Sequence, residues 1–91
     1  MEVGTIVKSK AGRDKNKVYC VYKLVDKDFV ELVNGDSRKL ENPKRKRTKH
    51  LDILNSSDLR QKLEQGQKIY DSDIKTILNP YKKSFNGGND A

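Results

Sequence analysis

The sequence of 91 residues has little of what most catalytic and metal sites require. It contains one cysteine, one histidine and no tryptophan. A metal site needs several well-spaced Cys, His or carboxylate ligands, and neither a P-loop nor a Rossmann fingerprint is present. We therefore expect no enzymatic activity, no bound metal and no cofactor. A single cysteine also cannot form an internal disulfide, which suits a reducing, intracellular compartment.

Long hydrophobic runs are absent as well. The longest uninterrupted apolar stretch extends only from Val18 to Tyr22, whereas a membrane-spanning helix needs about 20 apolar residues. The sequence does not open with a basic segment followed by an apolar one, so we expect no secretory signal, no membrane span and a cytoplasmic location. With 33% hydrophobic and 36% charged residues, the chain can build one small core but not two full domains.

Positive charge is in excess. Twenty Lys and Arg residues face thirteen Asp and Glu residues, which gives a net charge of +7. Residues 1–55 hold fourteen basic and eight acidic side chains, net +6, whereas residues 56–91 hold six and five, net +1. Such a field favours an anionic partner, either nucleic acid or an acidic membrane surface, and we expect the anion-binding surface in the first part of the chain.

The first part of the chain has the pattern of short strands. Short apolar runs alternate there with charged or Gly-containing clusters, and we expect strands at residues 5–9, 17–25, 29–33, 37–40 and 49–53. The second run has apolar residues on both faces, which is typical of a central strand in a strongly bent sheet. Asn34-Gly35 predicts a type I′ hairpin turn into the fourth strand. Four to five short strands predict a mainly β fold, a small barrel closed so that few edges remain exposed.

After Leu54 the pattern changes to that of helices. Asn55-Ser56-Ser57 predicts the cap of a first helix that ends at Gly66, and Asp71-Ser72 predicts the cap of a second helix. The second helix places one apolar stripe along its length, formed by Ile74, Ile77, Leu78 and Tyr81. The sequence thus predicts a barrel over residues 1–54, a helical appendage over 55–83 and a disordered tail over 84–91. The apolar stripes could pack on the barrel, on each other or on a partner protein.

Two basic segments are candidates for binding anions. Five of the six residues from Lys44 to Lys49 are basic, and clustered cations are what phosphate neutralisation requires. A solvated basic loop or a nuclear import signal are the alternatives. The second segment runs from Lys8 to Lys17 around Gly12, a residue that permits a positive φ or a close backbone approach to a ligand. A plain turn between two strands is its alternative.

The amino-terminal part resembles a known RNA-binding family. The run from Val3 to Val21, with Ala11-Gly12-Arg13-Asp14-Lys15 between its apolar segments, resembles the KOW motif. The continuation from Asn34 to Leu51 is similar to small bacterial KOW-domain proteins akin to archaeal and eukaryotic large-subunit ribosomal proteins. The resemblance covers about residues 2–51 and not the helices. It implies an SH3-like barrel of the KOW type and a ribosomal or ribosome-associated protein. Asn16 stands where the family usually has a second glycine, and asparagine best replaces glycine in a left-handed conformation.

The resemblance and the two basic segments together define a predicted basic set for RNA binding. Its basic members are Lys8, Lys10, Arg13, Lys15, Lys17, Arg38, Lys39, Lys44, Arg45, Lys46, Arg47 and Lys49, and Gly12 is included as the glycine of the loop. Tyr19 and Tyr22 could stack on bases or pack in the core, whereas Phe29 is expected in the core.

We therefore expect an RNA-binding protein that acts in translation and is monomeric when free. It would contact structured RNA, on the resemblance ribosomal RNA, mainly through phosphates. Two alternatives remain open at this point. One is a protein-interaction module that uses the barrel or the helices to bind a partner. The other is a DNA-associated basic protein, because cations bind both polyanions.

Overall fold

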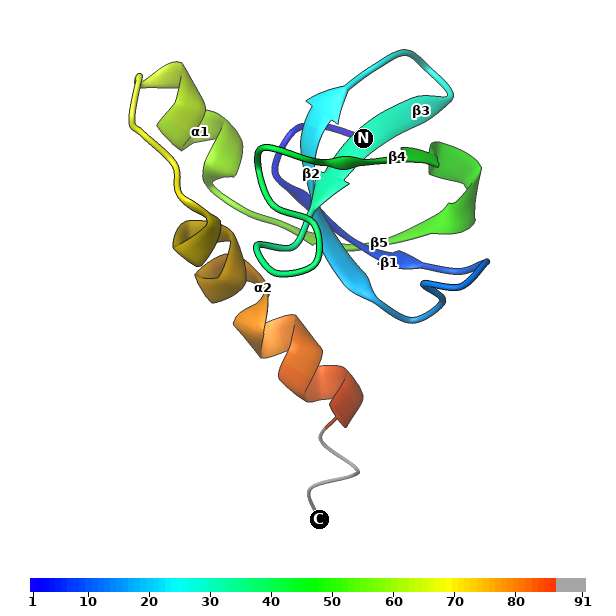
Figure 1. Cartoon of the computed structure of the whole chain (residues 1–91). Coiled ribbons are helices and arrows are strands. Elements are labelled where there is room, and N and C mark those ends of the chain that lie inside the picture. The colour runs from blue at the N-terminus through cyan, green and yellow to red at the C-terminus, as the bar shows by residue number, and fades with distance from the viewer. Residues whose placement is uncertain (87–91) are drawn as a thin grey trace.

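The computed structural model describes residues 1–86 and forms one antiparallel sheet with two helices beside it (Figure 1). The strands are β1 (Thr5–Ser9), β2 (Val18–Leu24), β3 (Phe29–Val33), β4 (Lys44–Arg47) and β5 (Leu51–Ser56). Their order in the sheet is β4-β3-β2-β1-β5. A single turn of 3-10 helix, η1 (Thr48–His50), connects β4 to β5, which returns to pair with β1. The predicted mainly β fold, with five short strands followed by two helices, is confirmed.

The sheet is open, which differs from the closed barrel that the sequence predicted. Strands β4 and β5 form its two edges and are joined by η1 instead of a hydrogen-bonded ladder. Strand β4 has only four residues and uses its ladder to pair with β3, from Leu32↔Lys44 to Phe29↔Arg47. A further backbone bond, 2.8 Å from the Thr48 N–H to the Asp28 carbonyl, ties η1 to the turn between β2 and β3.

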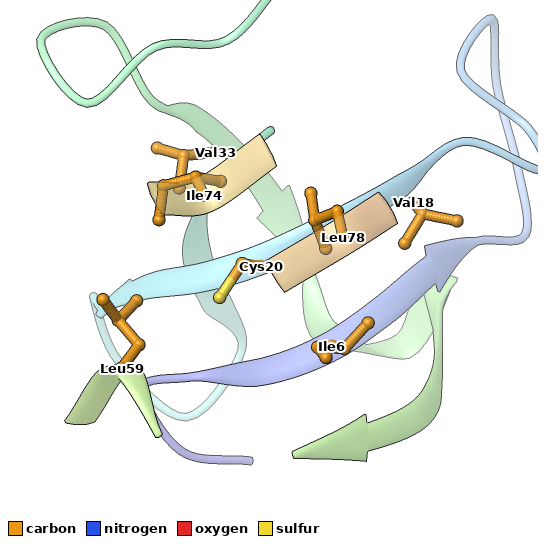
Figure 2. Packing of buried hydrophobic residues seen from close by; sticks show 7 residues of the cluster. All are labelled: Ile6, Val18, Cys20, Val33, Leu59, Ile74 and Leu78. Carbon is orange, nitrogen blue, oxygen red and sulfur yellow. The ribbon is translucent and has the colours of Figure 1, made fainter. Parts of the chain in front are cut away.

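Strand β2 is buried on both faces, as its sequence predicted, and it separates two apolar clusters. Tyr19 and Val21 point into the barrel, where the inner cluster consists of Val7, Tyr19, Val21, Val30, Leu32 and Leu51. Val18 and Cys20 point the other way, into an outer cluster that consists of Ile6, Val18, Cys20, Val33, Leu59, Ile74 and Leu78 (Figure 2). Successive strand residues face opposite sides of a sheet, so one short strand contributes to both clusters.

The two helices complete the outer cluster. Helix α1 (Leu59–Glu64) contributes Leu59, and α2 (Asp71–Asn86) contributes Ile74 and Leu78; all three side chains are fully buried. The apolar stripes of the helices therefore pack on the barrel. Packing on each other and packing on a partner protein were the two alternatives. The helices cover the outer face of β2, and without them Ile6, Val18, Cys20 and Val33 would lose the side chains that cover them.

The predicted strand at residues 37–40 is wrong. The side-chain Oδ1 of Asn34 accepts hydrogen bonds from the backbone N–H groups of Asp36 (2.9 Å) and Arg38 (2.8 Å). The Leu40 N–H donates to the carboxylate of Asp71 in α2. Side chains thus occupy the backbone donors that a strand would need for its ladder. Gly35 has a φ of +78° but Asn34 does not have a positive φ, so the predicted type I′ turn is wrong too.

The helix caps differ from the predicted ones in detail. The α1 N-cap is Asp58, because β5 continues through Ser56, and the Ser57 hydroxyl accepts the Leu59 N–H at 3.3 Å. At the start of α2, Asp73 accepts the Tyr70 N–H at 2.8 Å. Helix α2 continues past Pro80 to residue 86, so it includes the first residues of the predicted tail, 84–91. The rest of that tail lies outside the described residues.

Replacing Leu78 by alanine should destabilise the whole domain by about 3 kcal/mol, because it leaves a cavity where the helix meets the sheet. Denaturant unfolding followed by circular dichroism measures this change. The matched control is Leu63→Ala, since Leu63 lies in α1 but is 37% exposed. Equal effects of the two substitutions would contradict a shared core of helices and barrel.

Candidate nucleic-acid interface

The loop between β1 and β2 has a defined backbone and an exposed basic surface. Its ends are joined by backbone hydrogen bonds from Ser9 to Lys17 (2.9 Å) and from Asn16 to Ser9 (2.8 Å). Gly12 has a φ of +83° and Asn16 a φ of +74°. Of the two options that the sequence left open for Gly12, the structure shows the positive φ, and Asn16 has the left-handed conformation for which asparagine best replaces glycine. The loop exposes four members of the predicted basic set: Lys10, Arg13, Lys15 and Lys17.

Asp14 points from this loop into the protein, where it binds two lysines of β4. Its Oδ1 accepts hydrogen bonds from the Ser9 hydroxyl and from Lys46 Nζ, both at 2.8 Å. Lys44 Nζ lies 3.0 Å from Oδ2. Lys46 Nζ also donates to the Ala11 carbonyl at 3.0 Å. Asp14 is only 4% exposed, so a nearly buried carboxylate clamps the loop to the edge strand.

The environment of Asp14 stabilises its charged form. Burial alone would raise the pKa of its carboxyl, but hydrogen bonds from Lys46, Lys44 and Ser9 outweigh burial and hold the pKa well below its usual range. Neighbouring Tyr19 is affected in the opposite sense, because burial and the negative charge of Asp14 raise its pKa to about 12. Tyr19 is 2% exposed. Of its two predicted roles, core packing is therefore the one the structure supports.

The basic run from Lys44 to Lys49 does not form a single patch. Lys44–Arg47 is a strand that the sequence did not predict, and its side chains therefore alternate between two sides. Lys44 and Lys46 turn toward Asp14, and their side chains are 28% and 13% exposed. Arg45 and Arg47 turn outward, where the Arg47 guanidinium lies 4.8 Å from the centre of the Phe29 ring. Two of the five basic residues in the run thus pair with Asp14 inside the protein.

A hollow of about 390 Å³ lies between the β1–β2 loop and the connection from β3 to β4. We call it the basic hollow, and it is lined by Arg13, Asp14, Lys17, Tyr19, Ser37, Arg38, Asn42 and Lys44. Three of the lining cations, Arg13, Lys17 and Arg38, form no ion pair with any residue in 1–82, the part of the chain whose side chains the structure describes. Four members of the predicted basic set, distant in sequence, therefore converge on one concavity.

The other members of the predicted basic set lie around this hollow or away from it. Lys10 is paired with Asp52 at 3.6 Å, both roughly half exposed, and such surface pairs are weak. Lys8 is half-buried in β1. Four further members are exposed and do not line the hollow: Lys15, Lys39, Arg45 and Lys49. Sequence reasoning missed Ser37 and Asn42, which line the hollow as polar groups, and the structural role of Asp14.

Other kinds of site find little support within the described residues. Over that range no group of three or more His, Cys, Asp or Glu side chains could hold a metal ion. Burial raises the pKa of the Cys20 thiol to about 11, so it packs as a neutral apolar side chain. No helix within residues 1–86 is long and apolar enough to cross a membrane.

Replacing Asp14 by asparagine should destabilise the protein by about 3 kcal/mol, because Lys46 then stays nearly buried without a counter-charge. Denaturant unfolding at neutral pH gives this value. The matched control is Asp36→Asn, which removes an exposed carboxylate without an ion pair among the described residues and should change stability by less than about 0.5 kcal/mol. Similar effects of both variants would exclude the clamp.

Comparing the natural protein with Asp14→Asn at several pH values tests how the stabilisation by Asp14 depends on pH. A carboxyl whose folded pKa is lowered contributes its full stability above the pKa of the unfolded chain, about 3.9, and loses it as the pH falls through lower values. The stability difference between the natural protein and Asp14→Asn should therefore be constant near neutrality and shrink below about pH 4. A difference that stays constant down to pH 2 would contradict the lowered pKa of Asp14.

Comparison with known proteins adds no family assignment. No protein-family model and no curated protein sequence matches this chain. The function must therefore be inferred from the residues and their arrangement.

Proposed function

We propose that this protein binds structured RNA through phosphates held at the basic hollow. The observation that carries the proposal is the convergence of Arg13, Lys17 and Arg38 from two separate loops, none of them paired with a carboxylate in the described part of the chain. Neutralising phosphates with such cations releases counterions and is the main source of affinity for nucleic acids. Two of the three are arginines, whose planar guanidinium groups can bind a phosphate through two parallel hydrogen bonds.

The clamp at Asp14 supports this proposal by fixing the loop. A ligand that binds a mobile loop must also order it, and that cost reduces the affinity. Here the loop between β1 and β2 is held by Ser9, Lys44 and Lys46 before any ligand binds. Arg13 precedes Asp14 directly, Lys17 follows it three residues later, and both line the basic hollow. The cations are thus placed in advance of binding.

The aromatic residues of the strands favour phosphate contacts over base stacking or peptide binding. Tyr19 is buried, and Tyr22 and Phe29 are half-buried. Base stacking and the binding of proline-rich peptides both need exposed aromatic faces. A contact made only to the phosphate backbone of the RNA depends on charge and on the shape of the RNA more than on its base sequence. Ribosomal RNA as the target and a place on or near the ribosome rest on the resemblance to KOW-domain proteins.

Binding to a labelled RNA hairpin should weaken steeply with salt. Three neutralised phosphates correspond to a log-log slope of about −2 to −3, and the surrounding cations make it steeper. Replacing Arg13 and Arg38 together by glutamine should reduce the affinity at 0.1 M salt by about 30-fold and make the slope shallower by about 1.4 to 1.8. Fluorescence anisotropy over a series of salt concentrations measures both quantities.

The matched control replaces Lys23 and Lys27 by glutamine, which removes the same charge from the end of β2 opposite the basic hollow. This variant should lose little affinity. Equal losses in the two variants would reduce the mechanism to overall charge, and a slope near zero for the natural protein would favour the protein-interaction alternative. A DNA hairpin of the same sequence, if bound more tightly than the RNA, would favour the DNA-associated alternative.

A further inference from the structure

A second hollow adjoins the basic hollow and reaches helix α2. Its volume is also about 390 Å³, and we call it the helix-side hollow. It is lined by Asn16, Lys17, Val18, Asn34, Asp36, Ser37 and Lys82. Lys17 and Ser37 line both hollows, so the two lie side by side, with the basic hollow next to Lys44 of β4 and the helix-side hollow next to Lys82 in the last turns of α2.

We propose that Lys82 of α2 binds a further phosphate of the same RNA, so that the RNA-binding surface continues from the barrel onto the helix. This inference rests on the proposed function and extends it to a residue outside the part of the chain that resembles a KOW domain. The ligand group is a backbone phosphate next to the one held at the basic hollow, with Lys17 between the two.

The position of Lys82 follows from the apolar stripe of α2. Ile74, Leu78 and Lys82 are spaced four residues apart, so they lie on one face of the helix. The first two are fully buried against the barrel, and this face therefore brings Lys82 to the barrel where the apolar contacts end. The lysine is half-buried beside Lys17 instead of extending freely into solvent.

No carboxylate among the residues whose side chains the structure describes pairs with Lys82. The lysine has no ion pair or hydrogen bond with any residue whose side chain the structure describes. Asp36 lines the same hollow but is exposed and remains unpaired there, so two lysines face one carboxylate. An anionic ligand in this hollow would therefore meet more positive than negative charge.

Helix α2 contacts the connection from β3 to β4 at its start and strand β5 near its last turns. At its start, Asp71 Oδ1 accepts the Leu40 N–H at 2.8 Å, and a Cβ at Gly35 would clash with the Asp71 carbonyl oxygen. Near its end, Asn55 of β5 donates a hydrogen bond to the Tyr81 hydroxyl at 2.8 Å. Lys82 is therefore held beside the segment that carries Arg38, and binding needs no movement of the helix.

The test measures RNA affinity and salt slope for two neutral variants, Lys82→Gln and Lys82→Met. Removing one phosphate contact should weaken binding about five- to eightfold at 0.1 M salt and make the log-log slope shallower by about 0.7 to 0.9. Methionine keeps the aliphatic stem and the helix propensity of lysine, so it separates loss of charge from loss of packing. Lys82→Arg should retain the natural slope.

The matched control is Lys27→Gln, which removes one charge at the far end of β2 and should leave the slope unchanged. If both neutral Lys82 variants bind as Lys27→Gln does, while the natural protein binds RNA with a steep slope, the helix contact is overturned and the proposed function stands. If the natural protein does not bind RNA, both are overturned. A loss of affinity in Lys82→Gln that Lys82→Met does not share would also overturn the phosphate contact, because both variants lack the charge.

Discussion

The carboxylate of Asp14 is the group on which the arrangement of the basic surface depends. A chain with a net charge of +7 that brings two loops and an edge strand together must overcome repulsion between lysines. Asp14 reduces it by pairing with Lys44 and Lys46 at the point where the loop meets β4. The remaining cations of the loop then point outward. One negative charge inside the protein thus organises the positive charge that a polyanion would meet.

The second constraint is the small amount of apolar material. A domain of this size buries a modest share of its surface, and here β2 contributes to both clusters by placing Tyr19 and Val21 inside the barrel and Cys20 on the opposite face. The helices are therefore part of the core. Their packing also carries α2 along the barrel to the edge of the hollows. The packing of the helices on the sheet therefore contributes to the stability of the domain and also shapes the candidate surface.

The strands with apolar alternation could be predicted from the sequence, and so could the left-handed Asn16, because these depend on local chemistry. The strand at residues 44–47 could not, since lysine and arginine rarely favour strands and only pairing with β3 imposes the conformation. Two long-range facts were likewise invisible: the contact between Leu40 and Asp71, which removes the predicted strand at 37–40, and the approach of Lys82 to Lys17. The sequence analysis identified the two segments that carry the basic residues. It did not predict which of these residues are buried and which are exposed.

The open edge at β4 has a consequence for the protein in solution. An unpaired edge strand can pair with the edge of another molecule, and β4 is such an edge. The strand is short, and its outward Arg45 and Arg47 would bring like charges together if the β4 strands of two copies paired edge to edge. This repulsion would disfavour such a pair of two copies, and salt would screen it. The arginines that would add to the field of the proposed RNA-binding surface would thus also protect the edge of the sheet that carries them.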